Sequence, residues 1–167
     1  MNKQYYISEA KRAANIQINE LKKIKKIFNK SFIKAVDLIL NCKGKIIFAG
    51  IGKSGLIARK ISATFSSVGI PSFFCDPAQA LHGDMGQIEK KDILIIFSYS
   101  GNTSELTNMI KYANRYNIKI IGIASKPDSI LLKASDIKLI LPKVKESDVT
   151  GMVPTSSTSI TLILGDC

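Results

Sequence analysis

The sequence predicts an α/β fold in which helices cover both faces of a five-stranded parallel sheet and further helices precede it. Two observations support this prediction: short apolar runs alternate with helical patterns after residue 44, and these runs lack an alternation of polar and apolar side chains. Strands covered on both faces have such continuous runs, and parallel strands need crossover helices between them. We therefore expect a three-layer α/β/α sandwich in a single domain of residues 1–167.

Residues 1–43 are predicted to be a helical segment that precedes the α/β core of residues 44–167. Apolar residues recur at steps of three and four between Ser8 and Leu40, which is the spacing of one helix face. The pattern is interrupted near residues 29–31, where we expect Ser31 to cap a second helix.

Five apolar runs follow, and each is a predicted strand: residues 45–49, 72–75, 93–97, 118–124 and 137–141. A helical pattern over residues 56–68 follows the first strand, and an apolar helical pattern surrounds Ile160 and Leu164. We expect Pro154 to lie near the first position of this last helix, with the hydroxyl residues after it as caps.

Charge and composition exclude several classes of protein. The formal net charge is +11, from 24 Lys and Arg against 13 Asp and Glu, but many lysines alternate with Ile and Leu in the N-terminal segment. That arrangement is typical of the solvated face of a helix, and without interleaved aromatic residues we expect no nucleic-acid partner. No run reaches the length of a membrane span and no signal peptide is recognisable, so we expect no membrane association and a cytoplasmic location.

The three cysteines have no spacing typical of a metal site or of a disulfide framework. We therefore expect no bound metal, and the cysteines are predicted to be small apolar side chains.

The strongest functional signal is the run of hydroxyl residues that begins at Ser98, directly after the apolar run 93–97. A strand that ends in Ser-x-Ser-Gly-x-Thr and then turns helical presents N–H groups and hydroxyls to one point at a positive helix N-terminus. We expect Ser98, Ser100, Gly101 and Thr103 to bind a phosphate group. No P-loop occurs and we expect no dinucleotide-binding turn after the first strand, so the predicted ligand is a small phosphorylated metabolite, without a nucleotide cofactor.

Two turns are expected to meet at one crevice. If the strand order is 2-1-3-4-5, the order reverses between the first and third strands, which is where open parallel sheets bind ligands. The turns that follow these strands are residues 50–55 and 98–103. The sequence therefore predicts a ligand pocket between them.

Four segments together resemble the sugar isomerase (SIS) domain: residues 50–55, 80–86, 98–103 and 154–158, with the sequences Gly-Ile-Gly-Lys-Ser-Gly, Ala-Leu-His-Gly-Asp-Met-Gly, Ser-Tyr-Ser-Gly-Asn-Thr and Pro-Thr-Ser-Ser-Thr. They are most similar to the arabinose 5-phosphate isomerase branch, which interconverts D-ribulose 5-phosphate and D-arabinose 5-phosphate for the synthesis of Kdo, a lipopolysaccharide sugar. The resemblance implies a flavodoxin-like SIS fold, a homotetramer and a reaction without a cofactor. Many members continue into a pair of CBS domains and carry a further active-site histidine, both beyond the last residue of this chain.

The resemblance implies catalytic roles for Lys53, His82, Glu105 and Glu146. An aldose–ketose isomerisation passes through an enediolate, so it needs a base and a group that polarises the carbonyl oxygen. Lys53 follows a glycine at a helix N-terminus, where a cation needs a compensating anion. His82 is the only histidine and lies in a glycine-rich loop near a subunit boundary in the family, so it is expected to serve a neighbouring pocket.

Each candidate also has a structural interpretation. Lys53 and Glu146 are compatible with solvated surface charges, His82 with a structural histidine, and Glu105 with a first-turn carboxylate favoured by the helix dipole. The predicted substrate-binding residues are small or carry hydroxyls: Gly52, Ser54, Ser98, Ser100, Gly101, Thr103, Thr155, Ser156 and Ser157.

Two other functions remain open from the sequence. One is an isomerase of another phosphosugar, such as a hexulose or sedoheptulose phosphate. The other is a non-catalytic SIS module that senses a phosphosugar, which would need the phosphate turn but no base. The combination of two glutamates, a lysine and a histidine favours the enzyme.

Overall fold

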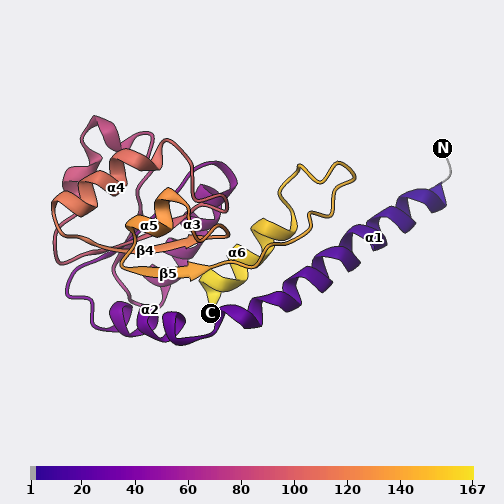
Figure 1. Cartoon of the computed structure of the whole chain (residues 1–167), viewed down its shortest axis with the longest axis horizontal. Helices are drawn as coiled ribbons and strands as arrows, with labels where there is room; N and C mark the ends of the chain where they lie inside the picture. Colours follow the sequence, from indigo (N-terminus) through magenta and orange to yellow (C-terminus); the bar gives the residue numbers. More distant parts are fainter. Residues whose placement is uncertain (1–2) are drawn as a thin grey trace.

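The computed structural model describes residues 3–167. Parallel strands form one sheet with helices on both faces (Figure 1). The strands are β1 (Ile46–Gly50), β2 (Ser72–Phe74), β3 (Ile93–Phe97), β4 (Lys119–Ala124) and β5 (Ile137–Ile140), in the order β2-β1-β3-β4-β5. The predicted five-stranded α/β sandwich is confirmed, and the strand order is 2-1-3-4-5.

The strands are apolar throughout because both of their faces are buried. In β1, Ile46 and Phe48 join the core on one face of the sheet, and Ile47 and Ala49 join the core on the other. The first face is covered by η1 (Lys22–Ile27), α2 (Lys30–Leu40), α3 (Gly52–Ser67) and α6 (Ser156–Asp166). The second is covered by α4 (Leu106–Arg115) and α5 (Ile130–Ala134), with the short turns η2 (Ala80–His82) and η3 (Asp84–Gln87).

The N-terminal segment is helical but only its second half joins the core. Helix α1 (Lys3–Leu21) extends away from the sandwich and has no buried residue (Figure 1). Ile18 is 55% exposed, whereas Ile24 and Ile27 of η1 are buried against the sheet. The repeat of apolar residues therefore predicts the helix correctly, although most of α1 does not pack into the core of residues 3–167.

Asn29, not Ser31, caps α2. The side-chain oxygen of Asn29 accepts a hydrogen bond from the main-chain N of Ser31 at 2.8 Å. The expected cap was therefore two residues too late, because Asn29 precedes the first helical residue and has the extended backbone of an N-cap.

Asp92 ties together the two strands that frame the predicted crevice. Its carboxylate is 1% exposed and accepts hydrogen bonds from the main-chain N of Lys45 at 2.7 Å and of Glu89 at 2.8 Å. The Lys45 amine lies 3.3 Å from the same carboxylate. This buried group fixes the chain ahead of β1 to the chain ahead of β3.

Within residues 3–167, the structure has no helix with the length and apolar character needed to cross a membrane.

Candidate functional site

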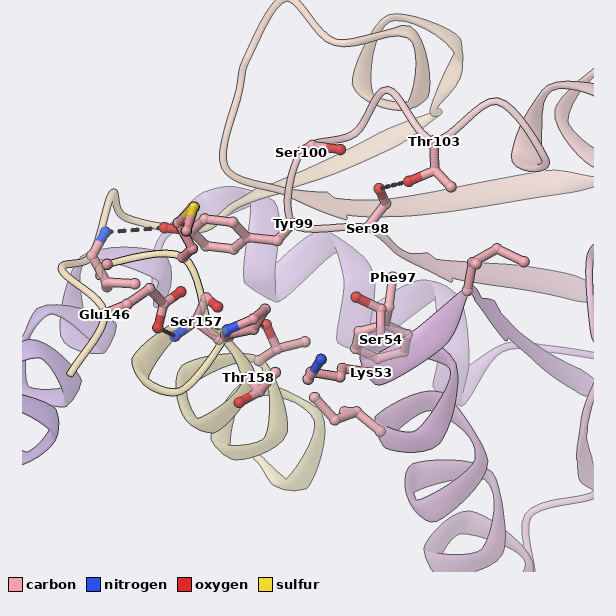
Figure 2. A pocket seen from close by; sticks show the side chains of 17 residues that line it. Lys53, Ser54, Phe97, Ser98, Tyr99, Ser100, Thr103, Glu146, Ser157 and Thr158 are labelled. Carbon is pink, nitrogen blue, oxygen red and sulfur yellow. Dashed lines mark hydrogen bonds between the residues drawn. The ribbon is translucent and has the colours of Figure 1, made fainter. Parts of the chain in front are cut away.

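A crevice of about 490 Å³ opens at the carboxyl ends of β1 and β3. Four segments line it: the start of α3, the turn after β3, the segment after β5, and the start of α6 (Figure 2). The two turns that the sequence predicted to converge, residues 50–55 and 98–103, both contribute lining residues. The crevice therefore lies where the strand order reverses.

The turn after β3 is held in shape by its own hydroxyls. Ser98 Oγ lies 2.9 Å from Thr103 Oγ1 and accepts a hydrogen bond from the main-chain N of Gly101 at 3.1 Å (Figure 2). Ser100 Oγ accepts from the main-chain N of Asn102 at 3.3 Å. The side chains of Ser98, Ser100 and Thr103 all line the crevice, which gives one wall several neutral donors for an anion.

Gly101 belongs to this turn for a steric reason. Its φ is +69°, and a Cβ at this position would lie 2.2 Å from Ser129 Oγ. Gly101 does not line the crevice, so its side of the turn packs on the residue before α5 instead. The glycine thus allows the hydroxyls on either side of it to face the crevice.

Lys53 and Ser54 enter the crevice from the first turn of α3. Lys53 forms no ion pair within residues 3–167. Its amine lies near Thr158, across from the hydroxyls of the turn after β3 (Figure 2). A cation at the N-terminus of a helix is electrostatically favourable only with an anion beside it, which matches a phosphorylated ligand.

The glycines of this turn correct one expectation. Gly50, Gly52 and Gly55 do have the Gly-x-Gly-x-x-Gly spacing of a dinucleotide-binding turn. A Cβ on Gly55 would lie 2.6 Å from the carbonyl oxygen of Gly50, and Gly52 has a φ of +58°. These two glycines are therefore required for the close approach of α3 to the end of β1, and Gly52 itself lines a neighbouring depression instead of the crevice.

Glu146 enters the crevice from the opposite side to Lys53 (Figure 2). Its Oε2 accepts hydrogen bonds from the main-chain N of Thr155 at 2.7 Å, from Thr155 Oγ1 at 2.9 Å and from the main-chain N of Ser157 at 3.3 Å. Partial burial acts to raise the pKa of Glu146, but the bonds from Ser157 and Thr155 outweigh it and the pKa is lowered. The side chain is therefore a carboxylate at neutral pH.

The start of α6 differs from the expected arrangement. Pro154 lies before the N-cap, Thr155 is the N-cap, and the helix begins at Ser156. Thr155 makes no side-chain cap of its own, because the Glu146 carboxylate accepts the N–H groups in its place. Ser157 lines the crevice, whereas Thr155 does not and the buried Ser156 Oγ has no hydrogen-bond partner within the described residues.

His82 and Glu105 lie outside the crevice of their own chain. Both are exposed: His82 ends η2, and Glu105 is the residue before α4. The Glu105 carboxylate accepts a hydrogen bond from Ser104 Oγ at 2.8 Å, which lowers its pKa. Of the four residues predicted to be catalytic, one chain thus brings together Lys53 and Glu146.

Sequence reasoning missed Tyr99 and Thr158, which also line the crevice. Tyr99 lies between the two serines of the phosphate turn, and its hydroxyl accepts a hydrogen bond from the main-chain N of Val144 at 3.0 Å (Figure 2). Partial burial raises the pKa of this phenol, so it stays protonated at neutral pH. Its position inside the Ser-x-Ser-Gly motif was the available signal, because a residue there is held next to the ligand.

Comparison with known proteins assigns the chain to a family. A family model described as the SIS domain matches residues 39–167, which is most of the chain. The chain belongs to the SIS domain family.

The relatives of this SIS domain include arabinose 5-phosphate isomerases. It is 41% identical over 146 residues to arabinose 5-phosphate isomerase KdsD of Escherichia coli K12, covering 87% of this chain and 44% of that protein. KdsD of Pseudomonas aeruginosa is 38% identical over 161 residues, covering 96% of this chain and 49% of that protein. The chain therefore spans about half the length of the curated relatives it matches.

A solved structure also matches this SIS domain closely. A protein of Escherichia coli CFT073, solved in complex with a sugar phosphate, superposes with a TM-score of 0.94 at 32% identity, covering 99% of this chain and 88% of that one. Both the family and the sandwich architecture that the sequence motifs indicated are thus confirmed.

No cluster of three or more His, Cys, Asp or Glu side chains that could hold a metal ion is present in residues 3–167.

Proposed function

We propose that this chain carries the active site of an aldose–ketose isomerase that acts on a phosphorylated sugar. One observation carries the proposal: a turn of neutral hydroxyls, a Lys53 without an ion pair in residues 3–167 and a charged Glu146 face one crevice. The hydroxyls and the amine suit a phosphate and a sugar oxygen, and the carboxylate supplies a base. Two arabinose 5-phosphate isomerases among the relatives, each matched over about half its length, support the same reaction class.

The specific reaction we propose interconverts D-ribulose 5-phosphate and D-arabinose 5-phosphate, which feeds Kdo and lipopolysaccharide synthesis. It is supported by the names of the relatives and by the complex of the Escherichia coli CFT073 protein, whose bound sugar phosphate we interpret as arabinose 5-phosphate. The crevice volume of about 490 Å³ is large enough for a five-carbon sugar phosphate.

In the mechanism we propose, the phosphate binds to Ser98, Ser100 and Thr103, and the other end of the open-chain sugar lies between Lys53 and Glu146. Glu146 removes the proton on the carbon next to the carbonyl, and Lys53 stabilises the negative oxygen of the enediolate. Return of the proton to the neighbouring carbon completes the isomerisation. No oxidant or cofactor enters this proton balance.

We propose further that the working form is a homotetramer, in which His82 of one subunit serves a neighbour's crevice. The exposed apolar side chains support a partner surface: Tyr5 and Ile7 on α1 are each 52% exposed, and Met152 in the loop before α6 is 78% exposed. Helix α1 and this loop project from the sandwich together (Figure 1).

The experiment that tests the proposed function is a substrate panel. The protein is incubated with pentose, hexose and sedoheptulose phosphates, and aldose–ketose conversion is followed by NMR. We expect conversion of ribulose 5-phosphate and arabinose 5-phosphate above all others. Faster conversion of another sugar phosphate would reassign the substrate, and binding without conversion would favour a sensing module.

A further inference from the structure

The segment that carries Glu146 has no regular secondary structure, yet its backbone is tied at several points. We call residues 142–147, which follow β5, the Glu146 strap. The main-chain N of Val144 donates to Tyr99 Oη at 3.0 Å, that of Lys145 to Glu20 Oε2 at 3.0 Å, and that of Ser147 to Thr155 Oγ1 at 2.8 Å. Three side chains from different parts of the molecule thus replace the strand partner that the strap lacks.

Tyr99 connects the strap to the phosphate turn. Its hydroxyl also donates to the carbonyl of Pro142 at 3.4 Å, so it bridges the two ends of the first half of the strap (Figure 2). The Tyr99 carbonyl accepts from the main-chain N of Ser125 at 2.9 Å and from Ser125 Oγ at 2.7 Å. The residue is therefore anchored at both ends, and a shift of the phosphate turn is transmitted to the strap.

Glu20 connects the strap to α1, which lies outside residues 39–167 matched by the family model. The Glu20 side chain is only 15% exposed, and its Oε2 accepts from both Lys145 N and the Lys23 amine. About two turns earlier on α1, Arg12 donates to the carbonyl of Ser147 at 3.1 Å. Helix α1 thus contacts the residues on both sides of Glu146.

We propose that Tyr99 and Glu20 are positioning residues that aim Glu146 into the crevice, so that α1 is a structural part of the active site. This inference rests on the proposed function of Glu146. Tyr99 and Glu20 fix two of the N–H groups just before Glu146, while Thr155 fixes the one just after it. Loss of either bond lets the strap move, and a displacement of about 1 Å at a reacting group can cost roughly 10²-fold in rate.

The first test separates rate from binding with matched variants. Tyr99→Phe keeps the ring but removes the hydroxyl, and Glu20→Ala removes the acceptor of Lys145. We expect kcat to fall roughly 10- to 100-fold in each, while inhibition by inorganic phosphate, which reports on the phosphate turn, stays within about twofold. Unchanged kcat in both variants would overturn the proposal, as would an equal loss of phosphate binding.

Two further comparisons exclude a general loss of stability. Glu20→Gln loses the charge that pairs with Lys23 but keeps an oxygen that accepts from Lys145, so it should restore most of the activity that Glu20→Ala loses. Tyr112→Phe and Asn19→Ala remove hydrogen-bonding side chains on α4 and α1 whose bonds do not reach the strap, and they should behave as wild type. Failure of the Gln rescue would contradict the positioning role.

The second test needs no activity. Glu146 accepts the N–H groups of Thr155 and Ser157, and neither of these bonds involves Tyr99 or Glu20. If the two residues position Glu146, amide hydrogen exchange at Thr155 and Ser157 should accelerate in Tyr99→Phe and in Glu20→Ala but not in the controls. Unchanged exchange would refute the proposal even if the wild-type protein isomerises no sugar phosphate, an outcome that would refute the proposed function instead.

Discussion

The carboxylate of Glu146 holds both polar groups of Thr155: it accepts from the main-chain N at 2.7 Å and from Oγ1 at 2.9 Å. Thr155 Oγ1 in turn accepts from the main-chain N of Ser147 at 2.8 Å. The loop of residues 147–154 is therefore closed at its base by this pair. The same carboxylate that faces the crevice also caps α6, which links the chemistry of the site to its shape.

This link gives the site a definite pH dependence. Because the pKa of Glu146 in the folded state lies below its ordinary value of 4.5, its hydrogen bonds stabilise the fold above that value and lose this effect as the pH falls through the folded pKa. We expect the difference in unfolding free energy between wild type and Glu146→Gln to stay constant at neutral pH and to shrink only in acid. Urea unfolding of both proteins across the acid range measures this, and a difference that grows as the pH falls would contradict the assignment.

Removal of one hydroxyl of the phosphate turn should weaken substrate binding. Ser100 is exposed to the crevice and bonds only within its own turn, so Ser100→Ala removes a donor to the phosphate without opening the core. We expect the loss of a charge-assisted bond of about 1–3 kcal/mol, seen as a rise in KM and in the Kd of inorganic phosphate. Ser67→Ala, which removes a hydroxyl at the far end of α3, is the control. Equal constants for Ser100→Ala and wild type would remove Ser100 from the site.

Asp92 should matter for stability and not for chemistry. Asp92→Ala leaves the N–H groups of Lys45 and Glu89 without an acceptor in a buried place. We expect a loss of about 2–5 kcal/mol in unfolding free energy, whereas Asp37→Ala on the exposed side of α2 should change it little. A loss in Asp92→Ala no greater than in the control would show that the tie between β1 and β3 is not needed.

The assembly prediction is independent of activity. Light scattering at micromolar concentration should give the mass of four chains, and Met152→Ser should shift the protein toward smaller species, because an exposed apolar loop is then made polar. A monomeric wild-type protein would refute the homotetramer.

The sheet and the phosphate turn could be predicted because both depend on local sequence. Continuous apolar runs such as residues 93–97 identify strands covered on both faces, and the hydroxyls after them mark the binding end. The meeting of residues 50–55 with residues 98–103 then follows from the strand order alone. These features needed no knowledge of long-range contacts.

The remaining features depend on contacts between distant residues. Nothing in the local sequence around Tyr99 or Glu20 indicates that their side chains reach the strap, since the bonds span 45 and 125 residues. The cap of α6 was misassigned for the same reason: the Glu146 carboxylate that replaces the usual hydroxyl cap lies nine residues before Thr155. His82 and Glu105 match the family pattern, yet their position outside the crevice of their own chain is a property of the fold that no motif encodes.

Exchange of deuterium from D₂O into the sugar phosphate tests the central claim most directly. Wild type should introduce deuterium at C1 or C2 of ribulose 5-phosphate, because proton abstraction gives an enediolate that solvent can relabel. Glu146→Gln keeps the shape but not the basicity, so its exchange should fall roughly 10²- to 10⁴-fold while phosphate binding changes little. Glu89→Gln, a change at an exposed ion pair, should exchange as wild type. Exchange at the wild-type rate in Glu146→Gln would contradict the account and pass the role of base to another residue, with Glu105 and His82 as the next candidates.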